Sequence, residues 1–215
     1  MKSAFISRMA PAALMCTTLL MSCGEAGEAL SNAISDNAVA AVEVSDNSSS
    51  QAQSTGFPSK VKKIAIEANK TFEVKGSLDE GEVISDLSWA DRSSTACFPG
   101  TQFSKFKANH VLYHTDLPPR SILNVKLIPD NPEGPAMSLY AYQIGTNNYS
   151  VVPDLGSAVS CEADHINDRP VRGKVEDGTR SVSLNATTNP YNVVIGITGV
   201  EGASGGYTLQ IELEQ

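Results

Sequence analysis

The last third of the chain, residues 181–213, contains three segments in which apolar residues occupy every second position. These segments are residues 181–187, 191–199 and 207–213. Because a β-strand sends alternate side chains to opposite faces, the pattern predicts three strands, each with one buried and one solvent-exposed face. Asn189-Pro190 and the glycine-rich run at 202–206 supply turns between them. The chain therefore ends in an all-β domain.

Further strand-like segments precede this region, separated by proline and glycine turns. They lie at residues 61–68, 72–74, 82–89, 110–117, 122–128 and 137–144, with 151–152 and 171–175 as short or edge strands. The polar stretch between Trp89 and Asn109 reads as a loop. About eight or nine strands with turns at this spacing predict one jelly-roll-like β-sandwich over residues 58–215. A chain of 215 residues is long enough for one such core.

The N-terminus has the features of an export signal. Lys2 and Arg8 precede an apolar run that is too short to span a bilayer. The run ends in Leu20-Met21-Ser22-Cys23, which resembles the lipobox of bacterial lipoproteins. The resemblance implies a signal peptide over 1–22 and a lipid attached to Cys23. Cys16 is an alternative, but Met15 is bulky where a small residue is needed, and an ordinary secretory signal is another.

Residues 23–57 are rich in Ala, Ser, Asn, Glu and Gln and contain no Lys or Arg, which predicts a disordered, flexible acidic tether. Loss of Lys2 and Arg8 with the signal peptide takes the formal net charge from −8 to −10. This charge disfavours nucleic acid as a partner. Gly24 follows the cysteine where many retained inner-membrane lipoproteins have Asp, so the analogy favours the outer membrane, at its periplasmic face or the cell surface.

Only Cys97 and Cys161 remain after Cys23 in the exported chain. The periplasm and the cell surface are oxidising, so we expect a disulfide between them. Metal binding by this pair is the alternative, although neither cysteine has a CxxC partner or a nearby pair of histidines.

The order of segments over residues 71–213 resembles the bacterial pre-peptidase C-terminal domain. The resemblance rests on Leu117-Pro118, on 123–127, on the Leu-Tyr segment 138–142, on 190–197 and on the closing Gly-Tyr-Thr-Leu of 206–209. Thr115 and Ala136-Met137 depart from the family pattern, and the two cysteines are an addition. The resemblance implies a non-catalytic jelly-roll sandwich of the kind that serves secreted enzymes as a binding or targeting module.

Two groups of polar residues were considered as metal sites. Glu162, Asp164 and Asp168 form the densest acidic cluster and could supply oxygen ligands to calcium, but their spacing matches no standard calcium loop. His110 and His114 would lie about 13 Å apart on a strand, too far to share a metal. We expect them to be exposed polar residues beside Asp116, and we assign no metal and no cofactor.

Aromatic residues offer one candidate for ligand binding. Tyr140 and Tyr142 fall on one face of the segment 137–144 and, with Tyr149, could form a platform for sugar or peptide. Packing in the core, in the second sheet of the sandwich, is the alternative explanation for them.

No catalytic signature is present: the sequence contains no GxSxG, HExxH, CxxC or phosphate-binding glycine loop. We therefore expect a lipid-anchored, non-catalytic binding or adhesion module of the cell envelope, with a polysaccharide or an envelope or matrix protein as its partner. The alternatives are a structural subunit that docks another envelope protein and a hydrolase with an unrecognised site.

Overall fold

The computed structural model describes residues 55–169, 172, 173 and 175–215. The predicted signal peptide, Cys23 and nearly all of the predicted tether lie outside these residues. The described chain forms strands β1 (Lys62–Lys63), β2 (Thr71–Ser77), β3 (Glu82–Val83), β4 (Asn109–Leu117), β5 (Ser121–Pro129), β6 (Met137–Ile144), β7 (Ser160–Asp164), β8 (Arg180–Ala186), β9 (Tyr191–Gly199) and β10 (Gly206–Glu214). No helix among the described residues is long and apolar enough to cross a membrane.

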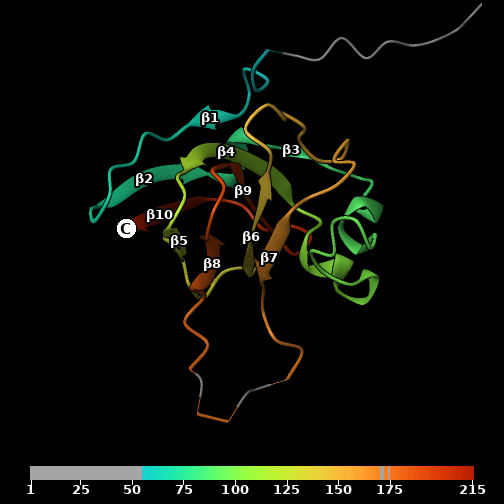
Figure 1. Cartoon of the computed structure of the whole chain (residues 1–215). Coiled ribbons are helices and arrows are strands. Elements are labelled where there is room, and N and C mark those ends of the chain that lie inside the picture. Colours follow the sequence, from blue (N-terminus) through green and yellow to red (C-terminus); the bar gives the residue numbers. More distant parts are fainter. Residues whose placement is uncertain (1–54, 170–171, 174) are drawn as a thin grey trace, which may run out of the picture. The chain divides into compact units, whose positions relative to one another are not determined.

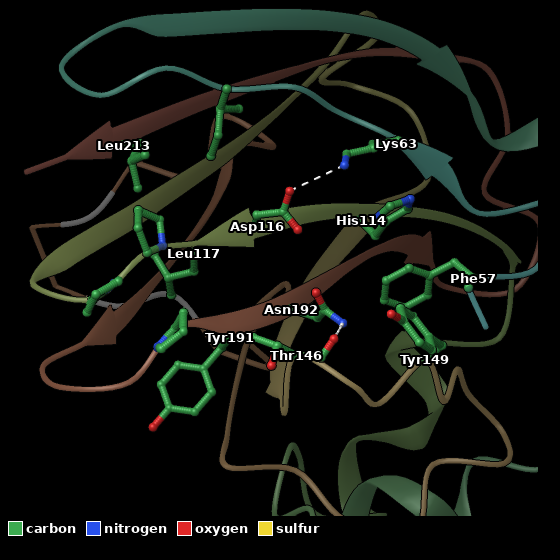
Figure 2. Close-up of a pocket in the computed structure, with 15 residues that line it drawn as sticks. Phe57, Lys63, His114, Asp116, Leu117, Thr146, Tyr149, Tyr191, Asn192 and Leu213 are labelled. Carbon is green, nitrogen blue, oxygen red and sulfur yellow. Dashed lines mark hydrogen bonds and ion pairs between the residues drawn. The ribbon is translucent and has the colours of Figure 1, made fainter. Parts of the chain in front are cut away.

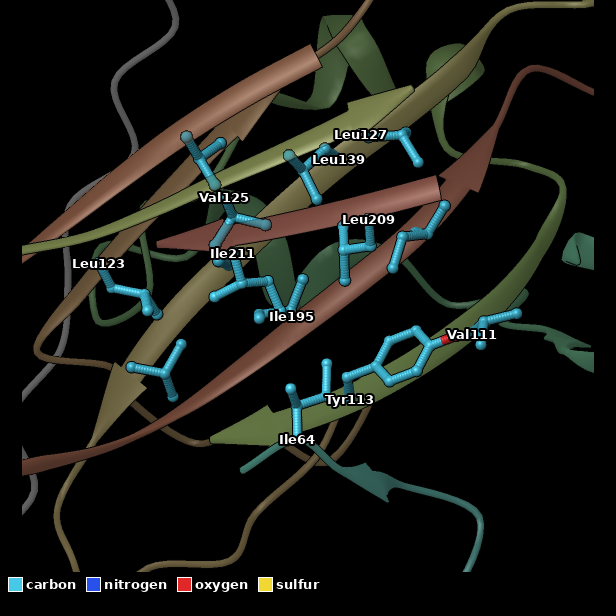
Figure 3. Packing of buried hydrophobic residues seen from close by; sticks show 14 of the residues in the cluster. Ile64, Val111, Tyr113, Leu123, Val125, Leu127, Leu139, Ile195, Leu209 and Ile211 are labelled. Atoms are coloured by element: carbon cyan, nitrogen blue, oxygen red, sulfur yellow. The ribbon is translucent and has the colours of Figure 1, made fainter. Parts of the chain in front are cut away.

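The strands form two sheets. The first has the order β1-β4-β9-β6-β7, with β3 also paired to β4, and the second has the order β2-β10-β5-β8 (Figure 1). Side chains from both sheets meet in one apolar core, in which Val125, Leu127, Leu209 and Ile211 of the second sheet face Val111, Tyr113, Leu139 and Ile195 of the first (Figure 3). The predicted all-β sandwich is confirmed.

The second sheet shows the alternation that the sequence predicts. Along β8, buried and exposed residues alternate without interruption, and β5 and β10 follow the same rule with small deviations. Val182 and Leu184 of β8 point into the core, whereas Ser181 and Ser183 face solvent. Each of these strands therefore has one buried and one solvent-facing side, as predicted.

The first sheet is different, because both of its faces are covered. All eight residues of β6 are buried, and so are the eight residues that follow Tyr191 in β9. The prediction that residues 191–199 have a solvent-exposed face is therefore wrong. The outer face of this sheet is covered by a second apolar core, in which the largest side chains are Trp89, Phe98, Phe106, Tyr140 and Tyr142.

The segment between β3 and β4 supplies one wall of this second core. It contains the short 3-10 helices η2 (Ser88–Asp91) and η3 (Gly100–Lys105), after η1 (Leu78–Glu80) earlier in the chain. The rings of Phe98 and Phe106 stack with centroids 3.7 Å apart, and Trp89 is fully buried. The region expected to be a polar loop is thus a third layer that packs through its aromatic residues.

Tyr140 can lie flat across the sheet because Gly196 is its partner on β9. A Cβ atom at Gly196 would fall 2.1 Å from the Tyr140 ring, well inside van der Waals contact. A glycine within a strand often marks such a close approach. The absence of a side chain at Gly196 therefore lets the Tyr140 ring, and with it the second core, lie close to the sheet.

Several strand predictions differ from the structure. Residues 82–89 contribute only β3, because the chain turns into η2, and residues 61–68 contribute only β1. Val151 and Val152 lie in a loop, while β7 was expected to be an acidic loop. Of the segment 171–175, residues 171 and 174 lie outside the described residues, and Val175 is not in a strand.

Candidate binding site

The predicted disulfide between Cys97 and Cys161 is confirmed, with Cα atoms 4.8 Å apart. Cys97 lies between η2 and η3, and Cys161 lies in β7. The bond therefore ties the third layer to an edge strand of the first sheet. Structural disulfides persist in oxidising compartments, so the pair indicates a location outside the cytoplasm.

Tyr140 and Tyr142 do not form an exposed platform. Both side chains are completely buried in the second core, and desolvation raises the pKa of each well above its ordinary value. The exposed platform is therefore wrong. The alternative of core packing holds, but the core is a second one on the outer face of the first sheet rather than in the second sheet. Tyr149, the third tyrosine of the proposed platform, lies instead beside a cavity.

His110 and His114 point to the same side of β4, as expected for residues four apart on a strand. His110 is not exposed: its Nδ1 lies 3.0 Å from the Tyr140 hydroxyl and its Nε2 lies 3.1 Å from the Phe106 carbonyl oxygen. Burial lowers the pKa of His110 to about 4. The expectation of two exposed histidines is thus wrong for His110, because the third layer covers it, while His114 is half-buried.

The three acidic residues that were candidates for calcium binding have different surroundings in the structure. The Asp164 carboxylate accepts a hydrogen bond of 2.8 Å from the backbone N–H of Ser181, and Asp168 forms an ion pair with Lys105. Lys105 holds the pKa of Asp168 below its ordinary value. Glu162 lies exposed on β7. Within the described residues, no group of three or more His, Cys, Asp or Glu side chains is placed to hold a metal ion.

The structure brings together a different set of residues, around a cavity of about 610 Å³ where β4 ends and β9 begins. Aromatic rings and polar groups line it: Phe57, His114, Asp116, Tyr149, Tyr191 and Asn192 (Figure 2). We call it the aromatic cavity. Its size falls in the range of ligand-binding clefts in proteins.

Phe57 lies between His114 and Tyr149 (Figure 2). Its ring stacks on His114 with centroids 4.2 Å apart and meets the ring of Tyr149 edge-on at 5.3 Å. The sequence placed Phe57 at the very end of the tether. In the structure its side chain packs against the sandwich and forms a wall of the cavity.

The loop after β6 is held in place by one amide group. The Asn192 side chain donates hydrogen bonds to the backbone carbonyls of Thr146 at 3.1 Å and Asn148 at 2.9 Å. The Tyr142 hydroxyl donates to the carbonyl of Ser150 at 3.2 Å. These bonds fix the residues on both sides of Tyr149, so its ring is positioned for contact before any ligand arrives.

Charge in the aromatic cavity is close to balanced. Lys63 and Asp116 form an ion pair with an N–O distance of 3.3 Å. Desolvation lowers the pKa of His114, and the positive charge of Lys63 lowers it further. His114 is therefore neutral near pH 7, and its buried Nδ1 has no hydrogen-bond partner among the described residues.

A second cavity, of about 600 Å³, lies farther along β4. Aliphatic and proline side chains, including Val61, Val83, Ile84, Leu112, Val152 and Pro153, line about half of it, and most of the other lining residues are polar or charged. We call it the apolar cavity. Val83 on its rim is 62% exposed, which is unusual for an aliphatic residue in a strand.

Sequence reasoning missed Phe57, Tyr191 and Asn192 as site residues. Tyr191 was read only as part of an alternating strand, and Phe57 as the last residue of a polar segment. The one signal that could have singled out Phe57 is that it is the only aromatic residue between Cys23 and Phe72.

No protein-family model and no curated protein matches the chain. Three solved structures are similar to it at low identity. The pre-peptidase C-terminal domain of a collagenase from Bacillus anthracis is 11% identical, covering 74% of this chain and 99% of that one, with a TM-score of 0.35. PliG, a periplasmic inhibitor of g-type lysozyme from Aeromonas hydrophila, is 12% identical (72% and 98% covered, TM-score 0.33). CorA, a surface-associated copper-binding protein of Methylomicrobium album BG8, is 9% identical (72% and 98%, TM-score 0.35). We carry over no residue role from them.

Proposed function

We propose that this protein is a lipid-anchored, non-catalytic binding module of the cell envelope. The observation that carries the proposal is the aromatic cavity. This preformed concave site combines the rings of Phe57, Tyr149 and Tyr191 with the Asn192 amide and the ion pair between Lys63 and Asp116. Preformed clefts with few convergent polar groups are typical of binding sites. The strongly shifted pKa of His110 does not suggest an acid or base catalyst, because burial causes it and both ring nitrogens already have partners.

The location follows from two independent features. The lipobox-like Leu20-Met21-Ser22-Cys23 supports attachment of a lipid to Cys23, and the disulfide fits an oxidising compartment. A lipoprotein carries two or three acyl chains, each buried methylene contributes about 0.8 kcal/mol, and stable anchoring requires more than one chain. An outer-membrane location remains part of the proposal on the strength of Gly24.

The anchor is tested with the full precursor carrying Cys23→Ser, expressed in an export-competent host and fractionated. We expect the unaltered protein in membranes and the variant in the soluble extracytoplasmic fraction. A variant that stays in membranes as firmly as the unaltered protein contradicts lipid attachment at Cys23.

Binding is tested by retention of the oxidised mature chain on peptidoglycan, on insoluble polysaccharides and on collagen. Tyr191→Ala removes a ring from the aromatic cavity, and we expect it to weaken retention on whichever matrix binds. Ile122→Ala is the matched control, because Ile122 is an exposed apolar residue on the second sheet and lines neither cavity. Retention on none of the matrices, or equal loss in both variants, contradicts a binding role for this cavity.

A further inference from the structure

One segment of the chain separates the aromatic cavity from the apolar cavity. Residues 56–63, which we call the strap, line both cavities: Gly56, Phe57 and Lys63 border the first, and Pro58 to Lys62 border the second. The other walls are also shared, because both cavities contain side chains of β4 and of the loop 146–153. The two cavities therefore share the strap as a common wall, and we call the two together the trough.

The strap meets the trough in the way that a bound peptide meets a protein. Its β1 residues pair in parallel with β4, with Lys62 opposite Tyr113 and Lys63 opposite His114, and the N–H of Ile64 donates to the His114 carbonyl at 2.9 Å. Addition of a strand to an exposed sheet edge is a common mode of peptide recognition, in which pockets for side chains provide specificity.

Two side chains of the strap lie at these cavities. Phe57 lies between His114 and Tyr149 in the aromatic cavity (Figure 2). Val61, four residues later, is 6% exposed at the apolar cavity. A turn, closed by the hydrogen bond from the Val61 N–H to the Pro58 carbonyl at 2.9 Å, sets the spacing between them.

Other contacts hold the strap only loosely. Its β-ladder is two residues long. The ion pairs Lys60–Glu82 and Lys62–Glu80 link the strap to residues 80 and 82, which also line the apolar cavity. In each pair both side chains are about half exposed or more. Exposed ion pairs contribute little to stability. The firm attachment is at Ile64, which is buried in the main core just after the strap.

We propose that the strap is an intramolecular ligand, and that the trough receives a peptide segment of a partner protein that presents an aromatic side chain and, four residues later, a branched aliphatic one. The partner's segment replaces the strap, residues 56–63, including Lys62 and Lys63, which pair with β4, while Ile64 keeps the domain intact. This inference rests on the proposed binding function and names its ligand class.

A peptide fits this trough better than a polysaccharide does, for two reasons. The place that the ligand takes is occupied by backbone paired to β4, and a sugar chain has no equivalent of that pairing. Aliphatic and proline side chains line about half of the cavity at Val61, and sugar hydroxyl groups packed against them would lose their hydrogen bonds with water, whereas a branched aliphatic side chain has none to lose.

The test uses the oxidised mature chain and a labelled synthetic peptide with the sequence of residues 55–63, Thr-Gly-Phe-Pro-Ser-Lys-Val-Lys-Lys. The Phe57→Ala variant removes the strap's side chain from the aromatic cavity, and Phe57→Ala combined with Val61→Ala removes the strap's side chains from both cavities. Phe72→Ala is the matched control, since it removes a half-buried aromatic ring from β2, outside both cavities. Fluorescence of the buried Trp89 and thermal unfolding verify that each variant is folded.

We expect the peptide to bind the Phe57→Ala variant at least tenfold more tightly than it binds the unaltered chain or the Phe72→Ala control. Replacement of phenylalanine by alanine in the peptide should abolish this binding. The proposal is overturned if folded forms of both strap variants fail to bind the peptide, or if the alanine peptide binds equally well. It is also overturned if emptying the trough increases retention on a polysaccharide instead. In any of these cases, retention of the unaltered chain that depends on Tyr191 leaves the proposed function standing, so the two failures can be told apart.

Discussion

The phenol oxygens of Tyr113 and Tyr207 lie 3.1 Å apart inside the sandwich, although the residues are 94 positions apart in the chain. Tyr113 belongs to β4 of the first sheet and Tyr207 to β10 of the second. Desolvation raises the pKa of Tyr207 far above its ordinary value, and the hydrogen bond to Tyr113 raises it further. The Tyr207 hydroxyl therefore stays protonated, and the two hydroxyl groups form a polar link between the two sheets.

This link depends on a glycine. A Cβ atom at Gly76 would lie 2.6 Å from the Tyr113 hydroxyl oxygen and 2.7 Å from that of Tyr207. We expect Gly76→Ala to lower the free energy of unfolding by about 2 kcal/mol, in the range of overpacked cores, measured by urea denaturation. Gly156→Ala is the control, because nothing lies within 4 Å of its added Cβ, and it should change stability by less than about 1 kcal/mol. Equal effects of the two substitutions would show that the tyrosine pair tolerates displacement.

Thr115 offers a stabilising substitution. Its side chain is 1% exposed and faces the main core, yet within the part of the chain that the structure describes its hydroxyl has no hydrogen-bond partner. Thr115→Val replaces this hydroxyl with a methyl group of similar size, so we expect it to raise the free energy of unfolding by about 1 kcal/mol.

The matched comparison is Thr198→Val. Thr198 is equally buried, but its hydroxyl donates to the Ala108 carbonyl at 3.2 Å. Here the same substitution should lower the free energy of unfolding by about 1 kcal/mol. Two changes of the same sign, measured by thermal and urea unfolding, would contradict the assignment of the two hydroxyl groups.

The disulfide should contribute substantially to stability. Cys97 and Cys161 are 64 residues apart, and the chain-entropy model gives about 4 kcal/mol for a loop of that length. The double variant Cys97→Ala, Cys161→Ala should lose stability of this order in urea denaturation. A reductant should destabilise the unaltered protein and leave the variant unaffected. If neither change alters the free energy of unfolding, the third layer packs on the first sheet without help from the disulfide.

Stability should fall in mild acid because of His110. Its pKa of about 4 in the folded protein lies below the ordinary value of 6.5, so the unfolded chain binds the proton more readily. This contribution is fully present above pH 6.5 and is lost as the pH falls towards 4, by up to about 3 kcal/mol. The contribution of His110 is isolated by comparing the free energy of unfolding of the unaltered protein and of His110→Asn between pH 7 and pH 4, because the carboxylates titrate in both proteins. Parallel pH profiles for the two proteins would refute it.

Removal of the strap's aromatic ring should be visible at His114. Burial lowers the pKa of this imidazole, and the Phe57 ring covers it. We expect Phe57→Ala to raise the pKa of His114 towards its ordinary value, as followed by NMR titration of the imidazole protons. The Phe72→Ala control should leave it unchanged. An unaltered titration in Phe57→Ala would show that other groups cause the burial.

The strands of the second sheet could be predicted because one face of each strand is exposed to solvent. In β8 the alternation of Ser181, Val182, Ser183 and Leu184 indicates which side chains point inward. In β6 the same reasoning cannot decide, because both faces carry apolar or aromatic residues. A sequence of this kind fits an exposed aromatic face as well as a second core. Only the packing of Trp89, Phe98 and Phe106 against Tyr140 settles the matter.

Short segments and isolated residues account for the rest of what the sequence did not reveal. β7 is a short edge strand with two acidic residues, and edge strands often carry charges that hide the strand pattern. The candidate site is assembled from Phe57, the end of β4, the loop after β6 and the start of β9. No local spacing links these segments, since only the pairing of β4 with β9 brings them together.

The contact between Tyr140 and Gly196 limits how this domain can change in evolution. A larger residue at position 196 collides with the ring before any compensation is available. A smaller residue at position 140 first removes the ring that contacts Trp89, Phe98 and Phe106. Each single step therefore leads to a less stable protein than the present pair or a jointly altered one. Among descendants of this sequence, positions 140 and 196 should change together or not at all.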